Sequence, residues 1–453
     1  MSWDLEASGQ QVPSDSTPSP SYVRLTSFAL GADAPSTQVE ELGLESEVIG
    51  IPASSPAAQK RLIFANNRLH TLPSSLWQSM RTHPPLPRPL LSYLVSELRK
   101  PRFQEPPEGD ISVHRFFQER LGKDVAEYLA DPFCRGITAG DSRKLSMRSL
   151  FPEIWRKTVA RGSLVKGMLL EKSLPATRES RGSLSRRVQQ DKWIAWSLTQ
   201  GLQRLPQHLT LTLRQTENVK ILTSSCIREI EFRNKKARVV RVTGDTGCEE
   251  EMEADVVFSS LPAFALASCL RDVDVQSALR RINFVDVTVA CLEFEGRNAL
   301  PRDAGFGFLT PSFEGTRVLG VTFDSCCFPQ HDGGRDITRV TCMMGGEWFG
   351  QLFPLHSEHE MLVEAEAAVR SILRVQSPLT RATIRVHRSC IPQYHVCHRD
   401  SVSHVRDCIS SRCPGFTLIG NSYDGVSVND VIYQSREAVR AFAIRSDAEE
   451  ASE

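Results

Sequence analysis

The sequence lacks long apolar runs, zinc-type cysteine pairs and an excess of either charge. No stretch of its 453 residues reaches the ~18 uncharged apolar residues that a membrane-spanning helix needs. This absence excludes a helix that crosses a bilayer, although a helix lying on a bilayer surface is still compatible with the sequence. Lys plus Arg equal Asp plus Glu at 54 each, so no global basic field exists to hold nucleic acid.

Cysteine occurs 12 times, but no Cys-x-x-Cys is present, and Cys326 and Cys327 are adjacent. This spacing suits neither a zinc ribbon nor a disulfide framework, so we expect reduced thiols. Five residues of zinc-ligand type do lie close together: His387, Cys390, His395, Cys397 and His398. We interpret them as ordinary strand residues whose side chains alternate between two faces, with zinc as the alternative.

The length and composition are those of a folded protein with several lobes. The chain is about three times as long as a typical domain of ~150 residues. Hydrophobic residues make up 40% and charged residues 24%, close to the averages for soluble globular proteins. Residues 1–39 differ from the rest, because the run from Pro13 to Pro20 is rich in Pro and Ser. We expect a disordered leader there, without a cleavable targeting signal.

Helical and strand patterns alternate in blocks after this leader. Apolar residues recur at helical spacing over 90–98 and again over 358–373. Between Asp141 and Gln190 there are 12 basic and 4 acidic residues, which gives one cationic segment. Several runs are rich in strand-forming residues: 61–65, 219–224, 226–232, 237–243, 254–259, 285–294 and 317–324. The pattern predicts a mixed α/β and α+β architecture with an inserted helical lobe.

The strongest local pattern lies near the C-terminus. A strand over Phe416–Ile419 is followed by a turn from Gly420 to Gly425 and by a helix from Val428 to Val439. Asn429 or Asp430 can cap this helix, and its free N–H groups favour an electron-rich ligand group. An ordinary strand-to-helix connection is the alternative. A nucleophile elbow is a third interpretation, which depends on Ser422.

Arg61 lies within an apolar strand pattern, where a guanidinium needs water or an anionic partner. It is therefore either a surface arginine at a strand edge or a clamp for a substrate carboxylate.

Five blocks, in this order, resemble the oxygen-dependent protoporphyrinogen oxidases, a family of the FAD amine-oxidase-like superfamily. The resemblance covers about residues 40–445. The blocks are Ala57–Arg61, Cys134–Ser146, Gly305–Gly307, Cys390–Tyr394 and Ser422–Asp430. The resemblance implies FAD-dependent oxidation of protoporphyrinogen IX to protoporphyrin IX, with O₂ reduced to three H₂O₂, in haem biosynthesis. It implies no metal and no catalytic side chain.

The resemblance also implies a multi-lobed flavoprotein fold. A discontinuous FAD-binding lobe with an adjoining substrate strand would comprise 40–78, 191–265 and 412–445. A helical, membrane-facing lobe would comprise 79–190, and a strand-rich substrate lobe 266–411. Carried over by position, the substrate-binding residues are Arg61, Phe306, Gly307 and Leu309. The cofactor-binding residues are Ile227, Asn421, Val426, Ser427 and Val428.

The family resemblance further implies a peripheral position on the mitochondrial inner membrane, and it leaves a homodimer and a contact with ferrochelatase open. One departure is large. The family's Gly-x-Gly-x-x-Gly, which brings a helix N-terminus to the FAD pyrophosphate, is missing from this sequence. We therefore expect residues 1–39 to replace the family's usual N-terminus. A non-catalytic chain that binds tetrapyrrole, or pairs with a complete enzyme of the family, is the alternative function, and a serine hydrolase is a further one.

Overall fold

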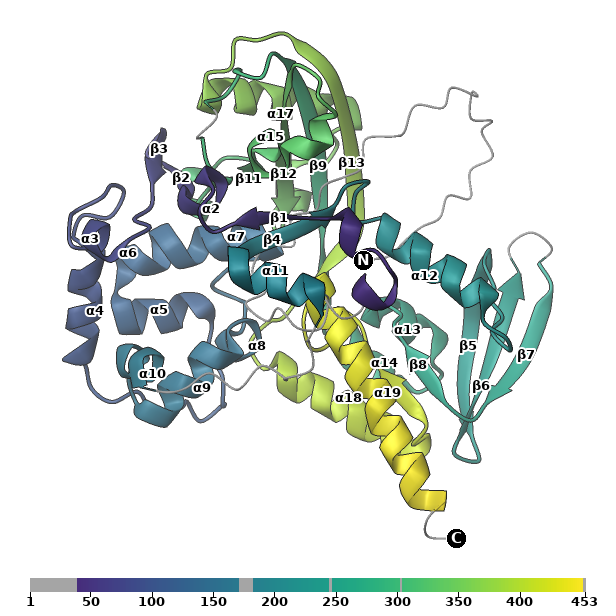
Figure 1. Ribbon diagram of the computed structural model, residues 1–453. Coiled ribbons are helices and arrows are strands. Elements are labelled where there is room, and N and C mark those ends of the chain that lie inside the picture. Colours follow the sequence, from purple (N-terminus) through teal and green to yellow (C-terminus); the bar gives the residue numbers. More distant parts are fainter. Residues whose placement is uncertain (1–38, 171–181, 244–246, 302–303, 451–453) are drawn as a thin grey trace.

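A computed structural model describes residues 39–170, 182–243, 247–301 and 304–450 of the chain (Figure 1). The predicted leader lies outside these residues except for Val39, which is buried at the start of a short helical turn. No helix in the described ranges is long and apolar enough to cross a membrane.

The largest element is a sheet of seven strands. Every neighbouring pair is antiparallel except β10 with β2, which is parallel. In spatial order the strands are β13 (Leu379–Gln393), β9 (Asn283–Glu295), β12 (Ile337–Gly346), β11 (Val318–Thr322), β10 (Gly307–Leu309), β2 (Leu62–Ala65) and β3 (Arg68–Thr71). The strand predictions over 285–294 and 317–324 are confirmed, with small shifts at the ends.

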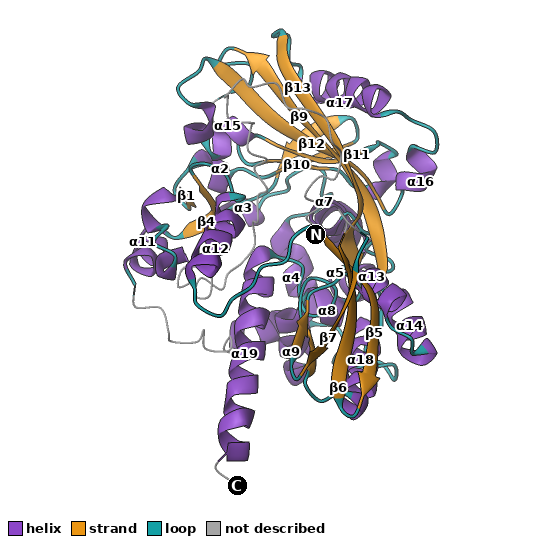
Figure 2. Cartoon of the chain, turned by 90° about the vertical axis from the view of Figure 1, so that its right-hand side faces the viewer, coloured by secondary structure: helices purple, strands orange, loops and turns teal. Residues whose placement is uncertain are grey.

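The two faces of this sheet are covered by different helices. Leu292 and Phe294 of β9 belong to a core that includes residues of α17 (Glu358–Leu373), which Figure 2 shows lying along the sheet. Val285 and Val287 point to the opposite face because side chains alternate along a strand, and there they pack with Ala139. The predicted helix over 358–373 is confirmed; it begins at a capping box formed by Ser357 and Glu360.

Helices between residues 76 and 170 form a second lobe, at the left of Figure 1. Its core contains Phe103, Phe116 and Trp155, and the ring of Phe103 meets the other two edge to face at 5.5 Å. The elements are α3 (Leu76–Ser79), α4 (Leu90–Leu98), α5 (Val113–Leu121), α6 (Lys123–Val125), the π-helical turn η2 (Ala126–Ala130), α7 (Asp131–Thr138), α8 (Met147–Leu150), α9 (Pro152–Arg161) and α10 (Leu164–Leu170). The predicted helix over 90–98 is confirmed as α4.

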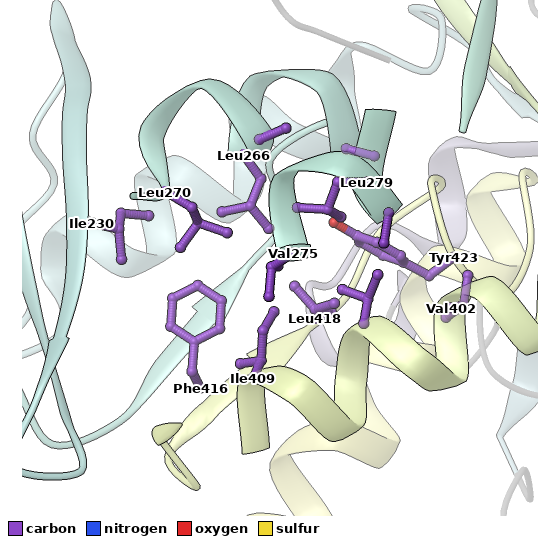
Figure 3. Close-up of a cluster of buried hydrophobic side chains, with 14 of the residues drawn as sticks. Ile230, Leu266, Leu270, Val275, Leu279, Val402, Ile409, Phe416, Leu418 and Tyr423 are labelled. Carbon is purple, nitrogen blue, oxygen red and sulfur yellow. The ribbon is translucent and has the colours of Figure 1, made fainter. Parts of the chain in front are cut away.

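A third core joins the chain's middle to its C-terminal part (Figure 3). Two parallel strands, β8 (Val257–Ser259) and β14 (Phe416–Leu418), lie beside the antiparallel strands β5 (Ser225–Arg233), β6 (Lys236–Thr243) and β7 (Glu249–Ala254). The helices here are α13 (Ala263–Cys269), α14 (Val273–Arg280), α18 (His398–Arg412) and α19 (Val428–Glu450). The predicted strand, turn and helix at the C-terminus are thereby confirmed.

The remaining elements connect these parts. The strands β1 (Val48–Pro52) and β4 (Trp193–Leu198) form an antiparallel pair. Short or peripheral helices complete the described chain: η1 (Glu45–Glu47), α2 (Pro56–Gln59), α11 (Ser183–Asp191), α12 (Arg204–Gln215), η3 (Ser312–Glu314), α15 (Asp324–Cys327), η4 (Pro329–Asp332) and α16 (Phe349–Leu352). The strand expected over 219–224 is wrong, because that segment is irregular.

Candidate functional site

Arg61 and Phe306, 245 positions apart in the sequence, lie on adjacent backbone segments. The N–H of Phe306 donates to the carbonyl of Lys60 at 3.0 Å, and β10 continues beside β2 with Phe308 opposite Leu62. Arg61 is the residue just before β2, and its side chain is exposed. The predicted clamp residue and the predicted ring-stacking residue are therefore neighbours across one parallel strand pair.

Gly307 permits β10 to lie close to its other neighbour, β11. Its φ is +151°, and a Cβ there would lie 2.2 Å from the carbonyl oxygen of Val321 on β11. Phe306 is fixed on both sides, because its carbonyl also accepts from the N–H of Phe323 at 2.9 Å. Its half-buried ring packs against a small core that includes Phe328. Any larger residue at 307 would separate the two strands that hold Phe306.

Leu309 is the second apolar residue of this group, and it lies between two glycines. A Cβ on Gly136 of α7 would be 2.2 Å from Leu309 Cδ2, and one on Gly320 of β11 would be 2.9 Å from the same atom. Helix α7 therefore contacts the face of β10 that carries Leu309. Alternation along the extended strands places Arg61 and Gly307 on this same face.

The predicted cofactor loop lies between β14 and α19. Asn421 is half-buried, and its carbonyl accepts from the phenol of Tyr394 at 2.5 Å. Tyr394 follows β13, and the preceding residue, Gln393, donates through Nε2 to the carbonyl of Thr138 at the end of α7 at 2.9 Å. The loop and the Leu309 group are thus joined through α7 and the end of β13.

The start of α19 offers both donors and an acceptor to a ligand. Ser427 caps the helix, since its Oγ accepts from the N–H of Asp430 at 3.1 Å and donates to the Asp430 carboxylate at 2.6 Å. The first-turn amides of Val428 and Asn429 have no intrahelical acceptor. Asn429 Oδ1 is buried, and no described residue donates a hydrogen bond to it. An isoalloxazine edge, which carries carbonyl oxygens and an N–H, fits this set, with half-buried Val426 beside it.

Ile227 lies apart from both groups, on β5. Its side chain packs on the third core, and its carbonyl accepts from the thiol of Cys269 with a 3.1 Å separation. The structure thus places Arg61, Gly307 and Leu309 on one face of neighbouring strands, while the same alternation turns the ring of Phe306 to the opposite face, where it packs near Phe328. Asn421, Val426, Ser427 and Val428 lie together on the segment before α19 and at its start. The structure places Ile227 on a separate sheet.

Ser422 is not presented as a nucleophile. Its hydroxyl is buried and accepts from the N–H of Ala263 at 3.1 Å. The ring of His398 is bonded instead to the carbonyl of Tyr423. This geometry contradicts the nucleophile-elbow interpretation and the hydrolase function built on it.

The described ranges contain no group of three or more His, Cys, Asp or Glu residues that could hold a metal ion, so they offer no support for the zinc alternative. The interpretation of the histidine-rich segment as one strand is wrong in part. Strand β13 ends at Gln393, Cys397 has a φ of +67°, and His398 begins α18. One hollow of about 260 Å³ lies elsewhere, lined by Ile230, Arg271, Asp272, Arg412 and neighbours. Its charged lining does not suit a flat apolar ligand.

The sequence interpretation missed two long-range contacts: the phenol of Tyr394 bonds to Asn421, and the guanidinium of Arg135 on α7 donates to the carbonyl of Thr310 at 3.2 Å. Both residues belong to blocks that carried the resemblance, but their partners lie 27 or more positions away. No local pattern could therefore have assigned them.

Comparison with known proteins defines the class. The family model for flavin containing amine oxidoreductases matches residues 35–442. Human protoporphyrinogen oxidase is 35% identical over 405 residues, which cover 88% of this chain and 82% of the human protein. "Protoporphyrinogen oxidase, mitochondrial" of Nicotiana tabacum is 26% identical, over 71% of this chain and 65% of that protein. A solved structure from Exiguobacterium sp. 255-15 shares the fold with a TM-score of 0.72 at 19% identity, covering 92% of this chain and 86% of that one.

The chain is therefore a flavoprotein oxidase whose cofactor is FAD. It belongs to the protoporphyrinogen oxidase family of the flavin containing amine oxidoreductases.

Proposed function

We propose that this chain oxidises protoporphyrinogen IX to protoporphyrin IX with O₂. Six electrons and six protons leave the substrate, and three O₂ molecules take them up as three H₂O₂. The observation that carries the proposal is the placement of Arg61 and Leu309 on one face of adjacent segments that α7 and β13 join to the loop before α19. Human protoporphyrinogen oxidase, at 35% identity, supports the substrate class.

The roles follow from the chemistry of each side chain. The exposed guanidinium of Arg61 would pair with a substrate propionate, and Leu309 on the same face would offer apolar surface to a pyrrole ring. The half-buried ring of Phe306 would meet a pyrrole ring from the other side of β10. FAD, when bound, supplies the hydride acceptor. Val428 and Asn429 would hold its pyrimidine edge through the amides and the orphan Oδ1, while Asn421, Val426 and Ser427 would line the ring and Ile227 would meet the adenine end.

Arg61→Ala is expected to lower kcat/KM about 10- to 100-fold, mainly through KM. A hydrogen bond to a charged group is worth about 1.5–3 kcal/mol, and about 1.4 kcal/mol corresponds to a tenfold change. The measurement is the growth of porphyrin fluorescence from protoporphyrinogen IX under O₂, together with bound FAD absorbance. Arg68→Ala is the matched control, because Arg68 is exposed on the neighbouring strand β3. Equal kcat/KM in both variants would contradict the role of Arg61.

The absence of Gly-x-Gly-x-x-Gly from the sequence favours one second candidate, a non-catalytic chain that binds tetrapyrrole or pairs with a complete enzyme of the family. This candidate predicts that the purified protein holds no FAD and forms no porphyrin, while porphyrin still quenches its Trp fluorescence. That quenching would be lost in Arg61→Ala. A purified protein that holds FAD and forms porphyrin would contradict this second candidate.

We propose that the helical lobe docks peripherally on a membrane, at the mitochondrial inner membrane in the cell. Helices α4 and α10 contact each other and expose apolar side chains. The exposed residues are Val95 (43%), Leu98 (41%), Met168 (50%), Leu169 (77%) and Leu170 (64%). Arg99, Lys100 and Lys166 stand beside them, as an anionic lipid surface requires. The mitochondrial name of the tobacco relative supports the location.

The double variant Leu169→Asp and Leu170→Asp is expected to lose at least tenfold in affinity for vesicles of phosphatidylcholine with an anionic phospholipid. Burial of each leucine contributes about 1.5–3 kcal/mol, and a buried carboxylate opposes insertion. Co-sedimentation measures the effect. Leu355→Asp is the control, because Leu355 is 95% exposed but lies in the loop between α16 and α17. If the control loses as much binding as the double variant, the docking surface is not at α10.

A further inference from the structure

Two stacked rings hold the turn between Asn421 and Gly425. The ring centroids of Tyr394 and His398 are 4.0 Å apart and their planes differ by 14°. Tyr394 is 3% exposed and His398 5%. Both rings hydrogen-bond to the loop that carries the predicted flavin contacts.

The phenol of Tyr394 bonds to both ends of the turn. It donates to the carbonyl of Asn421 at 2.5 Å and accepts from the N–H of Gly425 at 2.9 Å. The imidazole of His398 bonds to the middle of the same turn, through Nε2 to the carbonyl of Tyr423 at 2.9 Å. Because a carbonyl only accepts, Nε2 must carry the proton. Alternate backbone groups, at 421, 423 and 425, are therefore all satisfied by two side chains.

The two rings are themselves anchored. The carbonyl of Tyr394 accepts from the N–H of Ser146 at 2.8 Å, which ties it to the helical lobe. Gln393, the residue before it, bonds to Thr138 at the end of α7. His398 is the first residue of α18. The two rings therefore connect the turn to the helical lobe, to α7 and to α18. Side chains of the turn add two contacts of their own, Ser422 with Ala263 of α13 and Asp424 with Arg406 of α18.

Both rings keep the protonation state that these bonds need. Burial raises the pKa of the Tyr394 phenol, so the hydroxyl keeps the proton that it donates. Burial lowers the pKa of His398 to about 4, so the ring is neutral at physiological pH. The arrangement therefore does not change near neutrality.

We propose that Tyr394 and His398 are positioning residues that fix the 421–425 turn and thereby the start of α19 against the flavin. The proposal deepens the proposed function and rests on it for the placement of the flavin at this turn. Only four residues, Asp424 to Ser427, separate Tyr423 from Val428. A turn free to change its backbone dihedrals would displace the amides at 428 and 429, and preorganised donors are what a cofactor site requires.

Tyr394→Phe tests the proposal because it removes both bonds of the phenol and keeps the stacked ring. Tyr423→Phe is the matched control: its hydroxyl is buried in the third core and has no hydrogen-bond partner among the described residues (Figure 3). Two readouts are taken on each full chain. One is hydrogen exchange of the peptide spanning 419–428, and the other is FAD affinity from quenching of flavin fluorescence on titration of the protein.

Tyr394→Phe is expected to exchange the 419–428 peptide at least tenfold faster and to bind FAD about tenfold more weakly, whereas Tyr423→Phe matches the parent in both. Equal hydrogen exchange of this peptide in the two variants would contradict the role of Tyr394 in fixing the 421–425 turn. Faster exchange with unchanged FAD affinity would contradict the proposal that this turn positions the start of α19 against the flavin. If the parent chain binds no FAD, hydrogen exchange still tests whether Tyr394 fixes the turn. The missing FAD binding itself would count against the proposed function and against the placement of the flavin at this turn.

Discussion

Replacing Arg135 with Met is expected to lower the free energy of unfolding by about 3–5 kcal/mol, because each of three carbonyls left without its donor costs about 1–3 kcal/mol. Arg135 is 2% exposed on α7. Its guanidinium donates to the carbonyls of Thr310 at 3.2 Å, Pro311 at 3.0 Å and Thr316 at 2.6 Å. It also lies 5.0 Å from the centre of the Trp348 ring. Met fills most of the volume but leaves these carbonyls without a donor.

The same change is expected to reduce kcat/KM by more than the loss of folded protein explains, because the 310–316 loop follows β10 directly and α7 supports Leu309. Chemical denaturation gives the stability, and assays at a temperature where both proteins are folded give the activity. Arg143→Met is the control, since Arg143 reaches the same region but its side chain is 45% exposed and pairs with Asp131 at 3.4 Å. It should cost less than Arg135→Met, because the buried Asp131 keeps its bonds from Ser142 Oγ at 2.9 Å and from the N–H of Ser312 at 2.7 Å. An Arg135→Met chain as stable as the parent would contradict this prediction and would mean that the cost of burying the guanidinium cancels its hydrogen bonds.

Elements with strong local periodicity could be predicted from the sequence. Helix α17 has a capping box and regular apolar spacing, and β14 lies between a turn at Gly415 and the turn at Gly420. The segment 219–224 was misassigned because its apolar residues suggested a strand. Asn218 has a φ of +64° and Ser224 of +49°, so the backbone leaves the extended region at both ends, and the segment pairs with no described strand.

The site itself depends on contacts that no local pattern encodes. The parallel pairing of β2 with β10 joins residues 62 and 308, and only the family resemblance placed Arg61 beside Phe306. Tyr394 and His398 stack because β13 ends at Gln393, just before Tyr394, and Cys397 turns the chain between the two rings. In an extended strand, residues four positions apart share a face but lie about 13 Å from each other, so the strand interpretation could not predict this stacked pair. Burial and long-range hydrogen bonds, rather than propensity, decide both features.

Glu97→Ala should destabilise the helical lobe by about 3–5 kcal/mol, the cost of removing one partner from a buried ion pair. The Glu97 carboxylate is 0% exposed on α4. It accepts from Arg120 Nε at 2.9 Å, from Ser163 Oγ at 2.7 Å and from the N–H of Leu164 at 2.8 Å. It therefore links α4, α5 and the start of α10, and its removal leaves Arg120 buried without its carboxylate. Because α4 and α10 carry the proposed docking surface, the variant should also bind vesicles more weakly.

The pH dependence of the free energy of unfolding distinguishes the loss of the Glu97 charge from the loss of its packing volume. Burial alone would raise the pKa of Glu97, but hydrogen bonds from Ser163, Arg120 and the two amides outweigh it, and the pKa is lowered. A carboxyl with a lowered folded-state pKa contributes stability above its unfolded value, near about 4.3, and loses it as the pH falls through the folded value. The difference between parent and Glu97→Ala should hence be constant from pH 8 to pH 6 and shrink below about pH 4. Glu119→Ala, which removes an exposed partner of Arg115 on α5, should change stability by less than about 0.5 kcal/mol throughout. A difference for Glu97→Ala that stays constant into acid would assign the loss to the cavity rather than to the charge.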